Sequence, residues 1–294
     1  MCDYENAIEI NGLTKRYDGF TLDNVSLAVP RGSIMGFVGQ NGAGKTTTIR
    51  VLLGINRPDS GSIKLFGQTL GKNEAAIKSR IAVVFDELPF HECLNALQLD
   101  KIMRELYPKW DSGVFAAYLE RFSLPGKKKF SQLSKGMKMK LQIAVALSHD
   151  AELLIMDEAT SELDPVVRSE MLDVFLEFIA DEGHSILMSS HITSDLERIA
   201  DSITFIHGGK ILLSDQKDVI LDDHRIIKCG ADELSCIDSD DIISIRRSQF
   251  GCEAMVKNFS RNGHKYSNMI ADRAALDEIL LFAVKGMNGR EWRI

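Results

Sequence analysis

One stretch of the sequence decides the fold of this chain: Gly39-Gln40-Asn41-Gly42-Ala43-Gly44-Lys45-Thr46-Thr47. It fits the pattern G-x-x-x-x-G-K-[ST], in which glycines let the main chain turn so that successive N–H groups face a row of phosphates. The pattern has structural meaning only between a strand and a helix. Here an apolar run at 33–38 precedes it and helical spacing at 48–53 follows it. Lys45 brings a positive charge to the phosphate oxygens, and the Thr46 hydroxyl is suited to ligate Mg²⁺.

The residues around this loop predict a layered α/β core. Buried strands are predicted at the apolar runs 81–85, 153–156, 185–189 and 203–206, with helical spacing between them. Strands that alternate with helices predict a mixed, mostly parallel core sheet covered on both faces. Before the loop, alternating runs at 8–10 and 21–29 predict half-buried antiparallel strands, which would form an N-terminal β subdomain.

Two regions differ from this core in the spacing of their apolar residues. Residues from about 90 to 148 carry apolar residues at helical spacing without a convincing strand, which predicts an inserted helical subdomain. After Gly208-Gly209 the pattern predicts strands at 242–246 and 254–257, and then a helix at 274–284 that is capped by Asp272. We therefore expect two domains, a nucleotide-binding domain at 1–215 and a small α/β accessory or regulatory domain at 216–294.

The composition limits which classes of partner the chain is expected to bind and in which cellular compartment it is expected to work. The 42 acidic and 35 basic side chains give a net charge of −7, which argues against general binding of nucleic acid or of anionic membranes. The five cysteines contain no C-x-x-C pair and predict neither a disulfide framework nor a zinc site. No run approaches the ~20 apolar residues of a membrane-spanning helix, and the first residues carry no export signal. We expect a cytoplasmic chain that would need a second polypeptide to act across a membrane.

An acidic pair follows one of the predicted buried strands. Residues 153–156 are apolar and lead directly into Asp157-Glu158. Because parallel strands end at one edge of a sheet, these carboxylates should lie beside the phosphate-binding loop. Asp157 is the expected Mg²⁺ ligand, through water, and Glu158 is the candidate that orients and deprotonates an attacking water. A core strand capped by solvated acids is the alternative.

Three further motifs complete a pattern that resembles one family. Leu133-Ser134-Lys135-Gly136-Met137 stands before the acidic strand, Ser161-Glu162-Leu163-Asp164 follows it, and His191 ends the next strand. Over residues 7–215, the order and spacing of the motifs resemble the nucleotide-binding subunit of ATP-binding cassette (ABC) transporters. The form of the first motif and Tyr107-Pro108-Lys109-Trp110-Asp111 are similar to bacterial exporter ATPases of the ABC-2 type, including those linked to bacitracin-like antibiotics.

This resemblance implies a P-loop NTPase cassette and a role for the residues near the loop. Residues 39–47 would bind the triphosphate of ATP, with Lys45 as a catalytic residue. Thr46 and Asp157 would meet Mg²⁺. Tyr17 matches the aromatic side chain that stacks on adenine, and stacking of this kind contributes about 1–3 kcal/mol per base. The alternative for Tyr17 is a half-buried tyrosine of a strand.

The resemblance also implies that two subunits share each ATP. Ser134 and Gly136 match the signature that reaches a γ-phosphate, although a Ser-x-Gly sequence before a helix is by itself an ordinary N-cap. Asp164 matches the loop that crosses between subunits. His191 matches the switch histidine that contacts the γ-phosphate and holds Glu158 in place. The implied assembly is a head-to-tail homodimer or heterodimer of ATPase subunits.

Several positions depart from the family pattern. Lys135 replaces a signature glycine and Met137 a glutamine, Ala159 replaces a proline, and Glu162 replaces a glycine near the expected dimer seam. Asp86 stands where the family has a glutamine that touches Mg²⁺ and relays the nucleotide state to the membrane subunit. Asp86 is therefore the third expected metal contact, and the alternative is that it points to solvent.

The motifs together predict the function of an ATP-binding and ATP-hydrolysing subunit. Such a subunit would dimerise on ATP and power an integral-membrane permease, most simply an exporter, from the inner face of the cell membrane. The alternative is a soluble ABC ATPase that acts in translation or DNA repair. Proteins of those classes carry two cassettes or long inserted coiled coils, whereas this chain has one cassette and a short helical insert.

Overall fold

The computed structural model describes residues 4–71, 73–86, 90–161, 163–249, 251–287 and 291–293. Within them, the central sheet consists of β3 (Ile34–Val38), β5 (Ile81–Phe85), β6 (Leu153–Asp157), β7 (Ser185–Ser190), β8 (Ser202–His207) and β9 (Lys210–Gln216). The spatial order is β5, β6, β7, β3, β8, β9, and only β9 runs antiparallel to its neighbour. The predicted mixed, mostly parallel sheet is confirmed. Because β3, β6 and β7 are parallel, the segments that follow them leave the sheet at one edge.

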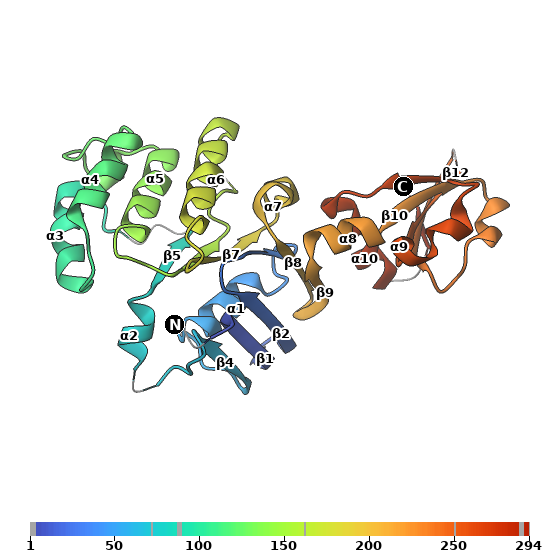
Figure 1. Cartoon of the computed structure of the whole chain (residues 1–294), viewed down its shortest axis with the longest axis horizontal. Coiled ribbons are helices and arrows are strands. Elements are labelled where there is room, and N and C mark those ends of the chain that lie inside the picture. The colour runs from blue at the N-terminus through green and yellow to red at the C-terminus, as the bar shows by residue number, and fades with distance from the viewer. Residues whose placement is uncertain are drawn as a thin grey trace.

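An antiparallel sheet packs against one side of this core. It consists of β1 (Asn6–Tyr17), β2 (Phe20–Pro30) and β4 (Ser60–Leu65), in the order β2, β1, β4. Helix α1 (Lys45–Leu52) lies against both sheets (Figure 1), and its Ile49 belongs to one apolar cluster with Ile10 of β1 and Phe37 of β3. This packing fixes the start of α1, which is also the end of the phosphate-binding loop.

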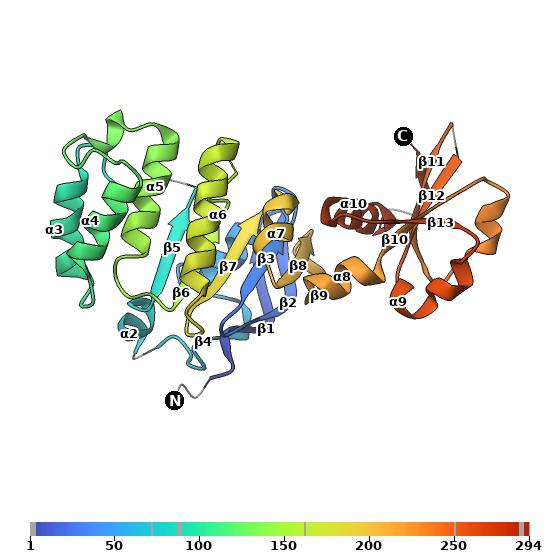
Figure 2. The same ribbon diagram turned by 45° about the horizontal axis from the view of Figure 1, so that its top comes forward.

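In the described residues, three α-helices form the insert between β5 and β6. They are α3 (Ala96–Leu106), α4 (Ser112–Arg121) and α5 (Lys135–Ala146), and they lie together at one end of the molecule (Figures 1 and 2). Each helix starts at a capping side chain. Asn95 forms a capping box with Gln98, Asp111 accepts from two amides of α4, and Ser134 accepts from the amide of Met137. The helices predicted within 90–148 are confirmed.

Further helices connect or cover the strands of the central sheet. They are α2 (Glu74–Lys78), α6 (Pro165–Ile179), α7 (Thr193–Ile199) and α8 (Lys217–Asp223). No helix in the described ranges has both the length and the apolar composition that a membrane crossing requires.

The last part of the chain forms a sheet of its own. Its described strands, in spatial order, are β13 (Ile270–Arg273), β10 (Arg225–Cys229), β12 (Gly251–Val256), β11 (Ile242–Ser248) and β14 (Glu291–Arg293). Helix α10 (Leu276–Met287) packs against β11 and α7, between the sheet and the core (Figure 2). Ile279 and Phe282 of α10 share an apolar cluster with Ile199 of α7. The C-terminal sheet is thus attached to the helix that follows His191.

The prediction that Asp272 caps the last helix is wrong. Asp272 lies in β13, where its carboxylate forms a 2.7 Å ion pair with Lys228 of the neighbouring strand β10. The helix begins later, at Leu276, whose amide donates to Oε1 of Glu197 in α7 at 2.7 Å. The amide before it, of Ala275, donates to Oε2 of Glu278 at 3.2 Å. The cap therefore comes partly from a side chain 79 residues away.

We predict that Glu197→Ala destabilises the C-terminal sheet and α10, because the Leu276 amide loses its acceptor at a helix N-terminus. The expected loss is about 1 kcal/mol, as for other N-terminal capping side chains. Urea denaturation followed by circular dichroism measures it, with Glu120→Ala on the exposed face of α4 as the control. Equal midpoints for the two variants would contradict the capping role.

Candidate active site

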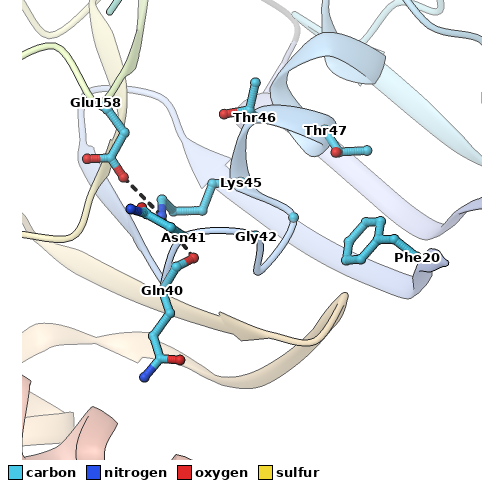
Figure 3. A pocket seen from close by; sticks show the side chains of 9 residues that line it. Phe20, Gln40, Asn41, Gly42, Lys45, Thr46, Thr47 and Glu158 are labelled. Atoms are coloured by element: carbon cyan, nitrogen blue, oxygen red, sulfur yellow. Dashed lines mark hydrogen bonds and ion pairs between the residues drawn. The ribbon is translucent and has the colours of Figure 1, made fainter. Parts of the chain in front are cut away.

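The phosphate-binding loop and Glu158, the second residue of the acidic pair, line one cavity. This cavity has a volume of about 350 Å³, and its lining residues are Phe20, Gln40, Asn41, Gly42, Gly44, Lys45, Thr46, Thr47 and Glu158. Figure 3 shows the Glu158 carboxylate and the Lys45 ammonium pointing toward one another, with Phe20 on the other side of the loop. Gly39 and Ala43 belong to the loop but do not line the cavity. The structure therefore brings together most of the residues that the sequence assigns to the triphosphate.

At two positions of the loop, the structure shows why the residue is glycine. A Cβ at Gly39 would lie 2.4 Å from the main-chain oxygen of Ile206, so only glycine fits where the loop leaves β3. Gly44 has φ of 116°, a conformation that side chains disfavour, and it directly precedes Lys45, the first residue of α1. Because Gly44 provides no capping side chain, the first amides of α1 and the positive end of its dipole suit an anion.

Lys45 is the buried charge of this cavity. Only 6% of its surface is exposed, and its Nζ donates to the main-chain oxygens of Gly39 at 2.5 Å and Gln40 at 3.3 Å. The same Nζ lies 2.9 Å from Oε1 of Glu158. The other carboxylate oxygen, Oε2, lies 2.7 Å from Nδ1 of His191. Lys45, Glu158 and His191 therefore form one chain of polar contacts from the loop to the end of β7.

The backbone of Glu158 aims its side chain at the loop. Its φ is 55°, a left-handed conformation that is uncommon for residues other than glycine. Strain of this kind costs on the order of 1–3 kcal/mol and persists where the surroundings hold it. Here the amide of Glu158 donates to the main-chain oxygen of Ser189 at 3.1 Å and faces its hydroxyl at 3.2 Å. Neighbouring strand β7 thus fixes the turn that follows β6.

A smaller cavity of about 180 Å³ adjoins the first. Its lining includes Thr46, Asp86, Asp157 and Glu158. Asp157 is buried, and its Oδ1 accepts a 2.7 Å hydrogen bond from the Ser189 hydroxyl. The described residues contain no cluster of three or more histidine, cysteine or acidic side chains placed to hold a metal by themselves. A hydroxyl and a buried carboxylate beside a phosphate site are the donor set of Mg²⁺, which takes one or two carboxylates and completes its shell with water and phosphate.

Asp86 faces this smaller cavity and a cation at the same time. Its amide donates to the main-chain oxygen of Asp157 at 3.1 Å. Its Oδ1 lies 3.8 Å from Nζ of Lys135, the first residue of α5, and both side chains are partly exposed. The positive end of a helix dipole lies at its N-terminus and repels a cation there. The carboxylate of Asp86 beside Lys135 offsets this repulsion. Two departures from the family pattern therefore lie side by side, which the sequence analysis did not anticipate.

The signature residues lie outside the cavity that holds Lys45. Ser134 is the N-cap of α5, where its Oγ accepts from the Met137 amide at 3.3 Å, and Gly136 lies in the first turn. Asp164 caps α6 and accepts from two amides at 3.1 Å each. Glu162 lies outside the described residues. Within one subunit, the start of α5 and the phosphate-binding loop do not form a common site.

Two aromatic residues lie at the turn between β1 and β2. Tyr17 is 42% exposed, and its hydroxyl accepts a 2.9 Å hydrogen bond from Nδ2 of Asn56. Tyr17 does not line the cavity, whereas its partner across the turn, Phe20, does. The sequence analysis missed Phe20. An aromatic residue at the start of a strand does not by itself indicate a binding site. Phe20 lies over Gly44 because of how β2 packs on the loop, and the sequence pattern does not reveal this packing.

Comparison with known proteins identifies the family. Residues 22–161 match the family described as ABC transporter. The chain is 38% identical over 208 residues to the bacitracin transport ATP-binding protein BcrA of Bacillus licheniformis, a match that covers 70% of this chain and 68% of BcrA. The chain belongs to the ABC transporter family. It is also 34% identical to the lantibiotic transport ATP-binding protein SrtF of Streptococcus pyogenes, over 72% of this chain and 91% of SrtF.

A solved structure supports the same assignment. The structure of an ATP binding subunit of an ABC transporter has a TM-score of 0.67 and 28% identity, and the match covers 73% of this chain and 91% of that one. This ABC protein is thus an ATP-binding subunit with the P-loop NTPase fold, and its ATP hydrolysis is coupled to transport. Its similarity to bacitracin and lantibiotic transport proteins confirms the resemblance to ABC-2 exporter ATPases.

We predict that Phe20→Ala weakens ATP binding because the ring forms a wall of the cavity beside Gly44 and Thr47. The expected loss is about tenfold in Kd, in line with 1–3 kcal/mol for an aromatic contact with a base. Calorimetric titration measures it, with inorganic tripolyphosphate as a second ligand and Tyr17→Ala as the comparison variant. Weakening of ATP but not of tripolyphosphate indicates contact with the nucleoside, and unchanged ATP binding would contradict the prediction.

Proposed function

We propose that this subunit hydrolyses Mg-ATP as one half of a head-to-tail dimer and thereby powers an integral-membrane exporter. The observation that carries the proposal is the chain of contacts from Lys45 through Glu158 to His191 inside the phosphate cavity. It supplies a cation for the triphosphate, a carboxylate for the attacking water, and a group that positions this carboxylate.

Binding of ATP replaces the partners of Lys45. The ammonium contacts Glu158 and two main-chain oxygens. The β- and γ-phosphate oxygens are stronger acceptors for a buried ammonium, and the amides at the start of α1 add further hydrogen bonds. Lys45 then turns from the carboxylate to the phosphates and leaves Glu158 available for a water.

Glu158 acts as the general base. Its Oε1 is buried and accepts no well-aligned hydrogen bond from the described residues, although the Lys45 ammonium is within ion-pair distance. Once Lys45 binds phosphate, Oε1 accepts the proton of the attacking water. His191 holds Oε2 at 2.7 Å and so keeps the carboxylate in place during this exchange.

Thr46 and Asp157 are the residues that would hold Mg²⁺. Both line the smaller cavity, and the Ser189 hydroxyl fixes the Asp157 carboxylate. An ion held there would supply positive charge to offset the negative charge of the triphosphate. Asp86 lines the same cavity and is the third residue that we propose as a metal contact.

The proposal of a dimer, either homomeric or heteromeric, rests on the position of the signature. Ser134 and Gly136, at the start of α5, do not line the cavity around the subunit's own Lys45. The first amides of α5 and the positive end of its dipole nevertheless suit an anion. A second subunit placed head to tail would bring its signature to the γ-phosphate bound here. Asp164, at the start of α6, would then lie along the seam.

The proposal of a membrane partner and of export rests on the relatives. BcrA and SrtF are named as bacitracin and lantibiotic transport proteins, and both match across the cassette. We infer a permease that anchors this subunit at the inner face of the cell membrane, and an accessory or regulatory role for residues 216–294. Co-purification with a polytopic membrane protein from a detergent extract supports this assignment, whereas co-sedimentation with ribosomes or DNA would point to a soluble ABC ATPase.

We predict that Glu158→Gln lowers ATP turnover by at least about a hundredfold, because the general base is lost. Lys45, Thr46 and the loop amides remain, so ATP binding is retained. The measurement is steady-state ATPase activity together with size-exclusion chromatography in Mg-ATP, where the variant should elute as a dimer. Full activity in Glu158→Gln would remove this residue from the role of base.

We predict that Asp86→Gln raises the basal ATPase rate of the isolated subunit by a few-fold. The carboxylate adds a negative charge near Asp157, Glu158 and the triphosphate, while its exposure and the Lys135 ammonium reduce the effect. Steady-state rates at saturating Mg-ATP measure it, with Asp150→Asn, which breaks an exposed ion pair with Lys109, as the control. An unchanged or slower Asp86→Gln enzyme with intact ATP binding would contradict the prediction.

A further inference from the structure

Two cysteines face one another in the C-terminal sheet. Cys229 is the last residue of β10, and Cys252, near the start of β12, is its direct partner in the antiparallel register. Both thiols are free, and their exposed fractions are 9% and 5%. Directly opposed residues of antiparallel strands point to the same face of a sheet, and both belong to the apolar cluster of that face with Ile227 and Ala254.

The register places these thiols within reach of a disulfide. Opposed residues of antiparallel strands have Cα atoms about 4.5 or 5.5 Å apart, and both values fall in the range of about 4.4–6.8 Å found for disulfides. The pair also occupies the last rung of the β10–β12 ladder. Gly230 follows Cys229, and Gly251, with φ of 145°, precedes Cys252. Glycines at both ends allow the small approach that closing the bond requires.

The two sulfurs differ in their surroundings. Nη1 of Arg247, on the neighbouring strand β11, lies 3.3 Å from Sγ of Cys252 and donates to it. A cationic hydrogen-bond donor beside the sulfur is typical of the surroundings of reactive cysteines. Burial is the main cause that raises the pKa of Cys229, and the nearby Cys252 and Glu233 add to it. Cys252 is therefore the sulfur suited to react first, and Cys229 the one suited to react second.

A cavity lies beside the last rung of the β10–β12 ladder. It has a volume of about 660 Å³, and both cysteines line it together with Lys228 and Arg246. A water molecule occupies only about 30 Å³ in the liquid, so a hydroperoxide enters such a space readily. Lys228 and Arg246 alternate with the cysteine positions in the register, so their side chains lie on the opposite face of the sheet. The sulfurs belong to the apolar cluster of the other face, and the cavity reaches the two cysteines where the ladder ends.

We propose that Cys229 and Cys252 form a peroxide-sensitive thiol pair. Hydrogen peroxide is attacked by the Cys252 sulfur, which gains an S–O bond as the O–O bond breaks, and one water leaves. The Cys229 sulfur then displaces the sulfenic oxygen, which leaves as a second water, and an S–S bond forms. In total, two thiols and one peroxide give one disulfide and two waters. Small thiols reverse the reaction by exchange.

The disulfide would tie two adjacent strands of the C-terminal sheet. The opposite face of β10 and β12 carries Ile226 and Met255, which join the apolar cluster shared by α7 and α10. A covalent link restricts the unfolded chain, so the oxidised sheet should resist unfolding more than the reduced sheet. The site lies far along the chain from the phosphate-binding loop and shares no residue with it.

Peptide mapping of the full-length chain tests the proposal. The reduced protein is treated with hydrogen peroxide, alkylated, and digested with trypsin without reduction. We expect peptide 229–246 to be joined to peptide 248–257, with the joint mass lower by two hydrogens than the sum of the free peptides. Dithiothreitol should separate them. The number of titratable thiols in the native protein should fall by two, and the unfolding midpoint of the oxidised protein should rise by several degrees.

Cysteine variants decide which sulfurs react. Peptide 229–246 also contains the exposed Cys236, so Cys236→Ser is the matched control and should keep the cross-link. Cys229→Ala and Cys252→Ala should each abolish it. Loss of the cross-link in Cys236→Ser would overturn the proposal. Oxidation of Cys252 to the sulfinic acid, with Cys229 still alkylated as a free thiol, would also overturn it. A third contradicting result is that neither Cys229 nor Cys252 reacts at a peroxide concentration that oxidises the exposed Cys93.

Discussion

A buried ammonium is the constraint on which the rest of this structure depends. Lys45 is almost completely removed from solvent, and an unpartnered charge there would cost several kcal/mol. The loop provides the main-chain oxygens of Gly39 and Gln40 as partners, and the turn after β6 provides Glu158. The carboxylate of Glu158 thus contacts the ammonium that, in the proposed mechanism, binds the phosphates of ATP. In that mechanism ATP displaces the carboxylate, and the exchange both binds the nucleotide and frees Glu158 to act on a water.

The order of the central strands makes this exchange possible. Strands β6, β7 and β3 are neighbours and parallel, so the acidic pair, His191 and the loop emerge at one edge. One residue of β7 contacts both acids, because the Ser189 hydroxyl donates to Asp157 and the Ser189 main-chain oxygen accepts from the amide of Glu158. The helix after β7 then contacts α10, which links the phosphate end of the sheet to a C-terminal unit with separate thiol chemistry.

Sequence predicts the parts of this protein that depend on local pattern. Apolar runs and the glycine-rich loop predict the parallel sheet, the helical insert and the site around Lys45, because period and spacing determine them. Contacts between distant residues carry no such signal, which is why the pairing of Asp86 with Lys135 and the cap that Glu197 provides to α10 were missed. Asp272 shows how a local rule fails: an acid shortly before a helix is a typical cap, but here strand pairing places it opposite a lysine.

The exchange of partners at Lys45 is tested most directly by the affinity for ATP without Mg²⁺, measured by calorimetry in the presence of a chelator so that no turnover occurs. If Glu158 competes with phosphate for the ammonium, Glu158→Gln binds ATP about tenfold more tightly than the natural protein, a difference of about 1.4 kcal/mol. Glu177→Gln, which alters an exposed ion pair with Arg121, should bind ATP as the natural protein does. Equal or weaker binding by Glu158→Gln would contradict the exchange.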